Sequence, residues 1–132
     1  MLLKGADNFL KHGVDQLLEQ VFEINQDELQ NHKDVYYTGI EFDGFLVSGL
    51  RGFEFKNKFI VEFAVTRPEC RRLGYIRKQL DALKLETRNM YVLATPDTTP
   101  FWIKMGFTEG GSDIENQQFN PYSDTYLLKF QD

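Results

Sequence analysis

The sequence predicts an α+β fold in which a mixed, mostly antiparallel sheet of about six to seven strands carries helices on both faces. Two observations support this prediction. The apolar residues follow a helical period near the N-terminus, then form three consecutive β-rich segments, and then return to a helical period. A short, almost entirely apolar segment comes next, as expected for a buried strand joined to a parallel neighbour through a helical crossover.

The composition predicts one domain over residues 1–132 with a substantial core. The chain has 132 residues, 42% of them hydrophobic and 12 of them Phe, which excludes a globally disordered chain. A net charge of −5 and a pI near 5.0 argue against nucleic acid or an anionic membrane as a partner.

Cysteine usage and hydropathy predict a cytoplasmic protein. The single cysteine, Cys70, excludes an intramolecular disulfide, which suits a reducing compartment. No apolar run approaches the length of a membrane span, and the first residues lack the apolar core of a signal peptide. Two histidines and one cysteine predict no metal site.

The N-terminal part is expected to form a very short strand over residues 1–4 and two helices. The first helix covers 8–22, where apolar residues recur at helical spacing: Leu10, Val14, Leu17, Leu18 and Val21. Asn25 followed by Glu28 has the spacing of a cap and its acidic partner, which predicts a second short helix over 26–32. We expect both helices to be scaffold.

A three-stranded antiparallel meander is expected next. Residues 36–42 and 45–55 are β-rich and are separated by Asp43-Gly44, a strong signal for a two-residue hairpin turn. A polar turn at 56–58 leads to the third strand, which covers 59–66.

The second half begins with a helix over 74–88, whose apolar face contains Leu73, Ile76, Leu80 and Leu83. The remaining segments are expected to be a buried strand, a short helix, a strand, a polar loop and a closing strand: 90–94, 98–105, 106–111, 112–123 and 124–130.

Two motifs in this half resemble those of a known family. Arg-Arg-Leu-Gly-Tyr-Ile at 71–76 resembles the acyl-CoA pyrophosphate loop, Gln/Arg-x-x-Gly-x-Gly/Ala, of the GCN5-related N-acetyltransferase (GNAT) family. Phe-Trp-Ile-Lys-Met-Gly-Phe at 101–107 resembles the Phe-Tyr-Glu-Lys-Leu-Gly-Phe segment of that family. The resemblance covers residue 36 to the C-terminus and implies a GNAT-like sheet that is splayed at its central strands.

The resemblance implies a site for acetyl-CoA, used as a co-substrate. Backbone amides and the helix dipole would bind the pyrophosphate, Gly74 would allow a close approach, and Arg71 and Arg72 would add charged contacts. The alternative is an ordinary helix start with solvated arginines. The predicted cofactor-binding residues are Ala64, Val65, Arg71, Arg72, Leu73, Gly74, Tyr75, Ile76, Thr95, Phe101 and Trp102.

Two positions depart from the family pattern. Ile76 replaces Gly or Ala, and its side chain either crowds the phosphates or points into the core with Leu73 and Leu80. Trp102 replaces a tyrosine, and an indole can donate a hydrogen bond but cannot deliver a proton. The general acid therefore stays open, with solvent as one source of the proton.

The resemblance further implies that the strand near Ala64-Val65 binds the pantetheine arm as an added strand would, with the Val65 amide polarising the thioester carbonyl. Glu62, a carboxylate within an apolar strand, is the predicted catalytic base. The alternative, which we weigh equally, is that the Glu62 carboxylate faces solvent or pairs with an arginine and takes no part in catalysis.

The predicted function is transfer of an acetyl group from acetyl-CoA to a primary amine, on a small molecule or a protein, by direct attack. The alternative is a non-catalytic or regulatory domain of the same fold that binds CoA or another protein. Asp113 and Glu115 in the late loop favour a cationic acceptor. An exposed strand edge near the C-terminus would allow a homodimer.

Overall fold

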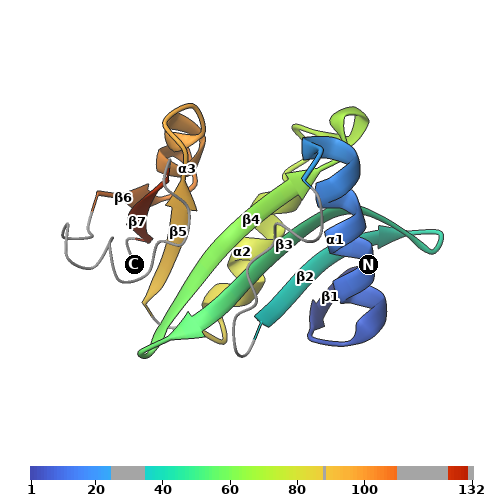
Figure 1. Ribbon diagram of the computed structural model, residues 1–132, viewed down its shortest axis with the longest axis horizontal. Coiled ribbons are helices and arrows are strands. Elements are labelled where there is room, and N and C mark those ends of the chain that lie inside the picture. Colours follow the sequence, from blue (N-terminus) through green and yellow to red (C-terminus); the bar gives the residue numbers. More distant parts are fainter. Residues whose placement is uncertain (25–34, 88, 110–124, 131–132) are drawn as a thin grey trace.

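The structure is a computed structural model that describes residues 1–24, 35–87, 89–109 and 125–130. Its strands form a seven-stranded sheet in the order β1-β2-β3-β4-β5-β7-β6, with helices on both faces (Figure 1). The strands are β1 (Leu2–Gly5), β2 (Val35–Phe42), β3 (Phe45–Phe55), β4 (Lys58–Thr66), β5 (Met90–Ala94), β6 (Phe107–Thr108) and β7 (Tyr126–Phe130). The helices are α1 (Asn8–Phe22), α2 (Tyr75–Lys84) and α3 (Thr99–Lys104).

This architecture confirms the predicted α+β class and strand number. Five of the strand pairs are antiparallel and β4 with β5 is parallel, so the sheet is mixed and mostly antiparallel as expected. The predicted helix over 26–32 and the predicted polar loop over 112–123 lie outside the described residues. No helix in the described part of the chain is long and apolar enough to cross a membrane.

Helix α1 covers one face of the meander. The Asp7 side chain caps its first turn by accepting a hydrogen bond from the Leu10 amide at 2.9 Å. Four residues of the apolar stripe of α1 are buried against β2, β3 and β4, and Val21 is partly buried beside them. The cluster includes Leu10, Val14, Leu17, Leu18, Tyr37, Leu46 and Val65. This burial is what the helical period of the sequence predicts.

The meander β2-β3-β4 forms as expected because its two turns are local. Asp43 and Gly44 have φ values of 51° and 84°, the left-handed pair that a tight hairpin turn requires. Lys56 and Asn57 repeat this geometry at the second turn, with φ values of 48° and 64°. In β4, Glu62 is the extra residue of a β-bulge, since the register between β3 and β4 shifts at this point.

Helix α2 covers the opposite face, and it ends earlier than predicted. Leu80 and Leu83 are buried against the sheet, but α2 ends at Lys84 instead of continuing to residue 88. Leu85 is 87% exposed, and both the amide and the hydroxyl of Thr87 donate to the Leu83 carbonyl at 2.8 Å. The Glu86 amide donates to the same carbonyl at 3.0 Å with the tighter 3₁₀ spacing, so α2 ends in a tightened last turn that the apolar spacing did not reveal.

The sheet opens between β4 and β5, as the resemblance implied. The two strands pair at Phe59–Met90, Ile60–Tyr91 and Val61–Val92, and beyond this point β5 continues beside β7 while β4 runs on along β3. Figure 1 shows the resulting V, with α3 above β5 and the end of α1 above β4. The open edge of β4 positions the candidate site.

Candidate active site

Two connected cavities lie where β4 and β5 separate. The first has a volume of about 510 Å³, and we call it the arginine cavity because Arg71, Arg72 and Arg77 line it. The second has a volume of about 350 Å³, and we call it the acidic cavity because Glu62 and Asp97 line it. Both cavities are lined by the same five residues at their junction: Phe22, Ala64, Asp97, Thr98 and Trp102.

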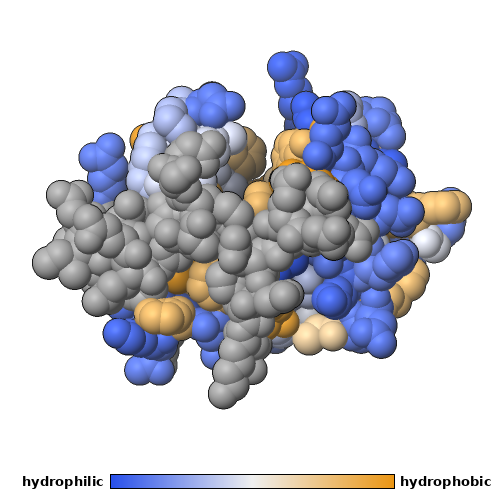
Figure 2. All heavy atoms as spheres, viewed as in Figure 1, coloured by the Kyte–Doolittle hydropathy of each residue, from blue (hydrophilic) through white to orange (hydrophobic). Residues whose placement is uncertain are grey.

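The surface is notched at this position. In the space-filling view, a notch separates the surface formed by α3 from that formed by α1, and hydrophobic side chains are visible at its base (Figure 2). Cavities of this size are in the range that holds small ligands and cofactors.

The bulge at Glu62 decides which backbone groups of β4 face the opening. The Arg67 amide donates to the Val47 carbonyl at 2.8 Å, and the Ser48 hydroxyl donates to the Val65 carbonyl at 3.1 Å. Backbone groups alternate in direction along a strand, so the amides of Val65 and Arg67 both point toward β3. The neighbouring groups of Ala64 therefore point toward the opening, and the open-edge amide belongs to Ala64 instead of Val65.

The loop between β4 and α2 borders the arginine cavity. A single 3₁₀ turn, Pro68–Cys70, is followed by Arg71, whose guanidinium Nε donates to the Thr66 carbonyl at 3.4 Å. Gly74 has a φ of 78°, and a Cβ built on it would contact nothing within 4 Å. The first amides of α2 follow directly, and such amides have no partner within their own helix. The loop thus presents positive groups beside an open space.

Ile76 does not close the arginine cavity. Its side chain packs against the core cluster on the α2 face and also forms part of the cavity wall. Of the two alternatives for this residue, the structure shows the one in which it points toward the core. Leu73 does not accompany it, because Leu73 precedes the helix and is 58% exposed.

The predicted cofactor residues separate into three groups. Eight of them line the arginine cavity: Ala64, Arg71, Arg72, Gly74, Tyr75, Ile76, Phe101 and Trp102. Thr95 lines the acidic cavity instead. Val65 and Leu73 are absent from both linings, since Val65 is buried in the core beneath α1 and Leu73 is exposed.

A buried polar network holds α2 against the sheet. Gln79 is fully buried, and its amide nitrogen donates to the Ser48 hydroxyl at 2.8 Å. The Thr38 hydroxyl donates to the side-chain oxygen Oε1 of Gln79 at 2.8 Å, and the hydroxyls of Ser48 and Thr66 lie 2.9 Å apart. The network therefore links the helix behind the loop to the end of β4. The sequence contained one signal for this network, namely a polar residue, Gln79, on the apolar side of the helix next to Leu80.

Trp102 stands in the aromatic core of α3 and β6. It is 5% exposed, and its ring lies edge-on to those of Phe101 and Phe107, with centroids 5.0 Å and 5.5 Å away. Arg77 connects α2 to this part of the fold by donating from Nη2 to the Lys104 carbonyl at 3.0 Å. Trp102 therefore forms a wall where both cavities meet.

Glu62 is paired with an arginine. Its side chain is 0% exposed, and its Oε1 lies 2.7 Å from Nε of Arg51. Arg51 also contacts Asp15, with Nη1 3.5 Å from Oδ1, and the Tyr37 hydroxyl donates to Asp15 at 3.3 Å. Burial raises the pKa of Asp15, against the opposing effect of the Arg51 guanidinium, and burial also raises the pKa of Tyr37. The arginine-paired alternative for Glu62 is thus the observed one.

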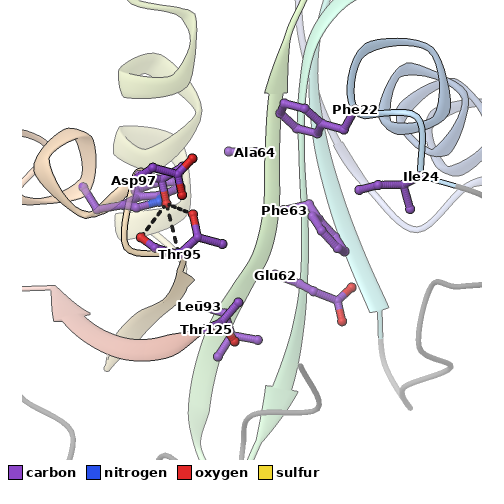
Figure 3. A pocket seen from close by; sticks show the side chains of 11 residues that line it. Phe22, Ile24, Glu62, Phe63, Ala64, Leu93, Thr95, Asp97 and Thr125 are labelled. Atoms are coloured by element: carbon purple, nitrogen blue, oxygen red, sulfur yellow. Dashed lines mark hydrogen bonds between the residues drawn. The ribbon is translucent and has the colours of Figure 1, made fainter. Parts of the chain in front are cut away.

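The turn after β5 places Asp97 at the junction of the cavities. The Thr95 amide donates to the Thr98 hydroxyl at 3.1 Å, and the Thr99 hydroxyl donates to the Thr95 carbonyl at 2.9 Å. Asp97, between them, is exposed. Figure 3 shows Thr95 and Asp97 on one side of β4, with Glu62 and Phe63 on the other.

Thr95 was among the predicted site residues, and Asp97 was not. The available signal was an acidic residue in the turn directly after a buried strand. In the described ranges, no group of three or more metal-ligating side chains is found.

Comparison with known proteins identifies the fold. No protein-family model matches the chain, and no curated protein matches its sequence. The structure is similar to that of Tetrahymena GCN5, with a TM-score of 0.76 and 13% identity over 98% of this chain and 94% of that one. It is also similar to an acyl-CoA N-acyltransferase from Pseudomonas aeruginosa, with a TM-score of 0.68 and 17% identity over 99% of both chains.

A further similar structure is the catalytic domain of the Tetrahymena GCN5 histone acetyltransferase in complex with coenzyme A. Its TM-score is 0.65 and its identity 12%, over 98% of this chain and 91% of that one. The chain therefore has the GNAT fold, which confirms the resemblance seen in its two motifs.

Proposed function

We propose that this protein transfers an acetyl group from acetyl-CoA to a primary amine. The observation that carries the proposal is the arginine cavity, which lies between the open edge of β4 and the first turn of α2. This combination offers an unpaired strand edge for an amide-containing arm and a cationic, amide-rich end for phosphates. The fold is shared with acetyltransferases, one of them solved with coenzyme A.

The chain's own groups fit acetyl-CoA in two parts. Arg71, Arg72 and the amides that follow Gly74 would bind the pyrophosphate. The backbone of Ala64 and Thr66 would bind the pantetheine arm, and the Ala64 amide would polarise the acetyl carbonyl at the junction of the cavities. The role that sequence analysis gave to Val65 therefore moves to Ala64 in this proposal.

The reaction exchanges one bond at the acetyl carbon. A carbon–nitrogen bond to the amine forms and the carbon–sulfur bond breaks, so the sulfur leaves as a thiolate. A protonated amine loses two protons in the process; one is released to solvent and the other restores the thiol of CoA. A neutral amine is needed for the attack, so a base is required.

Glu62 remains our proposed base, because it contributes to the wall of the acidic cavity. Its buried ion pair with Arg51 requires the carboxylate to exchange the guanidinium for the amine during turnover. Glu62→Gln is therefore expected to lower kcat at least about tenfold, with the Kd for acetyl-CoA unchanged. A lower melting temperature with unchanged kcat would mean that Glu62 serves the ion pair alone.

The second candidate function is a CoA-binding module without catalysis. Two observations favour it, namely the ion pair of Glu62 and the presence of Trp102 where the family has a tyrosine. The experiment that decides between the two combines isothermal titration with acetyl-CoA and a thiol-release assay with a panel of amines. Desulfo-CoA and ATP serve as controls for the titration.

Saturable binding with amine-dependent thiol release supports the transferase. Binding with no thiol release supports the module, and no binding at all would contradict both. The predicted homodimer stays a prediction, which the apparent mass in solution would test.

A further inference from the structure

We propose that the acidic cavity binds the acceptor, and that it selects a small primary amine carried on an aromatic or branched apolar group, with Asp97 binding its ammonium. This inference rests on the proposed function, since it names the acceptor class for the same site. It uses three properties of the described residues: the charge of the cavity wall, the apolar character of that wall, and the position of Asp97.

The two cavities differ in charge. The arginine cavity is lined by three arginines and one carboxylate, that of Asp97. Among the residues that the structure describes, the wall of the acidic cavity contains two carboxylates, Glu62 and Asp97, and no Lys, Arg or His. An anionic or neutral acceptor has no positive partner in that wall, whereas an ammonium ion does have a negative one.

The wall of the acidic cavity is otherwise largely apolar. Six of its residues are aromatic or aliphatic: Phe22, Ile24, Phe63, Ala64, Leu93 and Trp102. Figure 3 shows Phe22, Ile24 and Phe63 together on one side, facing the turn that contains Asp97 across the strand. A ring or branched chain against these side chains gains about 25 cal/mol for each Å² of apolar area removed from water. A polyamine would bring extra charges into this small, largely apolar space, and removing those charges from water is costly.

Asp97 is better placed than Glu62 to bind the ammonium. Glu62 is 0% exposed, and Arg51 offsets its charge at 2.7 Å. Asp97 is exposed and belongs to the lining of both cavities, next to the open edge at Ala64. A nitrogen held by Asp97 therefore lies at the junction, where the acetyl carbonyl is proposed to lie.

The chain carries its own reporter for a binding experiment. Trp102 is the single tryptophan of the sequence, and it lines both cavities. The tryptophan fluorescence of the CoA-saturated protein would be titrated with 2-phenylethylamine, ethylamine and spermidine. We expect a saturable change with 2-phenylethylamine at a Kd about tenfold lower than that of ethylamine, because of the apolar area that the ring buries.

Asp97→Asn tests the named residue. We expect it to raise the Kd for 2-phenylethylamine about tenfold, the size of one charge-assisted hydrogen bond, and to leave the Kd for acetyl-CoA within about twofold. The matched control is Asp43→Asn, the same change at an exposed turn far along the chain from both cavities, and it should alter neither value. The KM for the amine in the thiol-release assay should follow the same order.

Failure of this inference and failure of the proposed function can be distinguished. If the wild-type protein does not bind acetyl-CoA, the proposed function is contradicted. Acetyl-CoA binding with spermidine or ethylamine bound more tightly than 2-phenylethylamine contradicts the acceptor class. Tight 2-phenylethylamine binding that is unchanged in Asp97→Asn contradicts the role of Asp97.

Discussion

The arginine cavity and the acidic cavity share one strand edge but are assembled in different ways. The arginine cavity is formed mostly by one continuous run of chain, from β4 through the loop into α2, with α3 as its far wall. The acidic cavity is lined by residues from the end of α1, the middle of β4, β5 and the turn after it, α3, and the residue before β7. A cavity of the first kind leaves a motif in the sequence, and one of the second kind does not.

The largest expected effect concerns the support of the acidic cavity. Arg51→Met would leave the buried carboxylates of Glu62 and Asp15 without their shared guanidinium. Removing one partner of a buried ion pair typically costs about 3–5 kcal/mol, so the free energy of unfolding should fall by that amount in urea titrations. Arg67→Met is the control, because Arg67 donates to a neutral carbonyl, and it should cost only about 1 kcal/mol. Equal losses in the two variants would contradict the buried network.

The polar network that supports the arginine cavity should contribute less to the free energy of unfolding than the ion pairs of Arg51 do. Gln79→Leu removes the amide that links Ser48 and Thr38, leaving buried hydroxyls short of partners. We expect a loss of about 2 kcal/mol in the free energy of unfolding and weaker acetyl-CoA binding, since α2 and its loop lose their link to β3. Gln16→Leu on the exposed side of α1 is the matched control. Unchanged stability in Gln79→Leu would contradict the proposed role of the network.

Arg72 tests the charge of the arginine cavity alone. Arg72 has a φ of 68°, which asparagine tolerates well, so Arg72→Asn removes the charge with little backbone strain. We expect the Kd for acetyl-CoA to rise about tenfold at low salt and the Kd for 2-phenylethylamine to stay unchanged. Lys78→Asn, on the exposed side of α2, should change neither constant. A loss of amine binding in Arg72→Asn would contradict the separation of the two cavities.

The smallest expected effect is a dependence of the free energy of unfolding on pH, caused by the titration of Asp15. Burial raises the pKa of Asp15 above its ordinary value of 3.8. Its contribution to stability is therefore fully present below that value and is lost as pH rises through the folded-state pKa. Asp15→Asn removes this loss, so the variant should gain stability relative to the wild type as pH rises from about 4. Urea titrations across this pH range measure the difference, and a difference that falls with pH would mean that the attraction of Arg51 outweighs burial.

The fold could be predicted from the sequence because its determinants are local. The Asp43-Gly44 turn needs two residues with positive φ, and the pair supplies them. The switch to helical period at α2 and the apolar β5 predicted the parallel crossover. The predicted end of α2 was wrong because the last turn of the helix tightens, with the amides of Glu86 and Thr87 sharing the Leu83 carbonyl, and this does not alter the apolar pattern.

The site could be predicted only where it follows a motif. The residues at 71–76 lie on the arginine cavity, apart from Leu73. The bulge that turns the Ala64 backbone outward depends on pairing with β3, and the pairing of Glu62 with Arg51 joins residues of two strands, so neither could be read along the chain. Asp113 and Glu115, which favoured a cationic acceptor, lie outside the described residues.

The most direct test of the account uses two glycines with the same backbone geometry. Gly74 and Gly44 have φ values of 78° and 84°, and a Cβ on either contacts nothing within 4 Å. Glutamate at either position therefore brings similar backbone strain, but only Gly74 lines the arginine cavity. Isothermal titration with acetyl-CoA should show at least a 100-fold loss of affinity, about 2.7 kcal/mol, in Gly74→Glu and none in Gly44→Glu. Equal affinities in the two variants would contradict the assignment of the arginine cavity to acetyl-CoA.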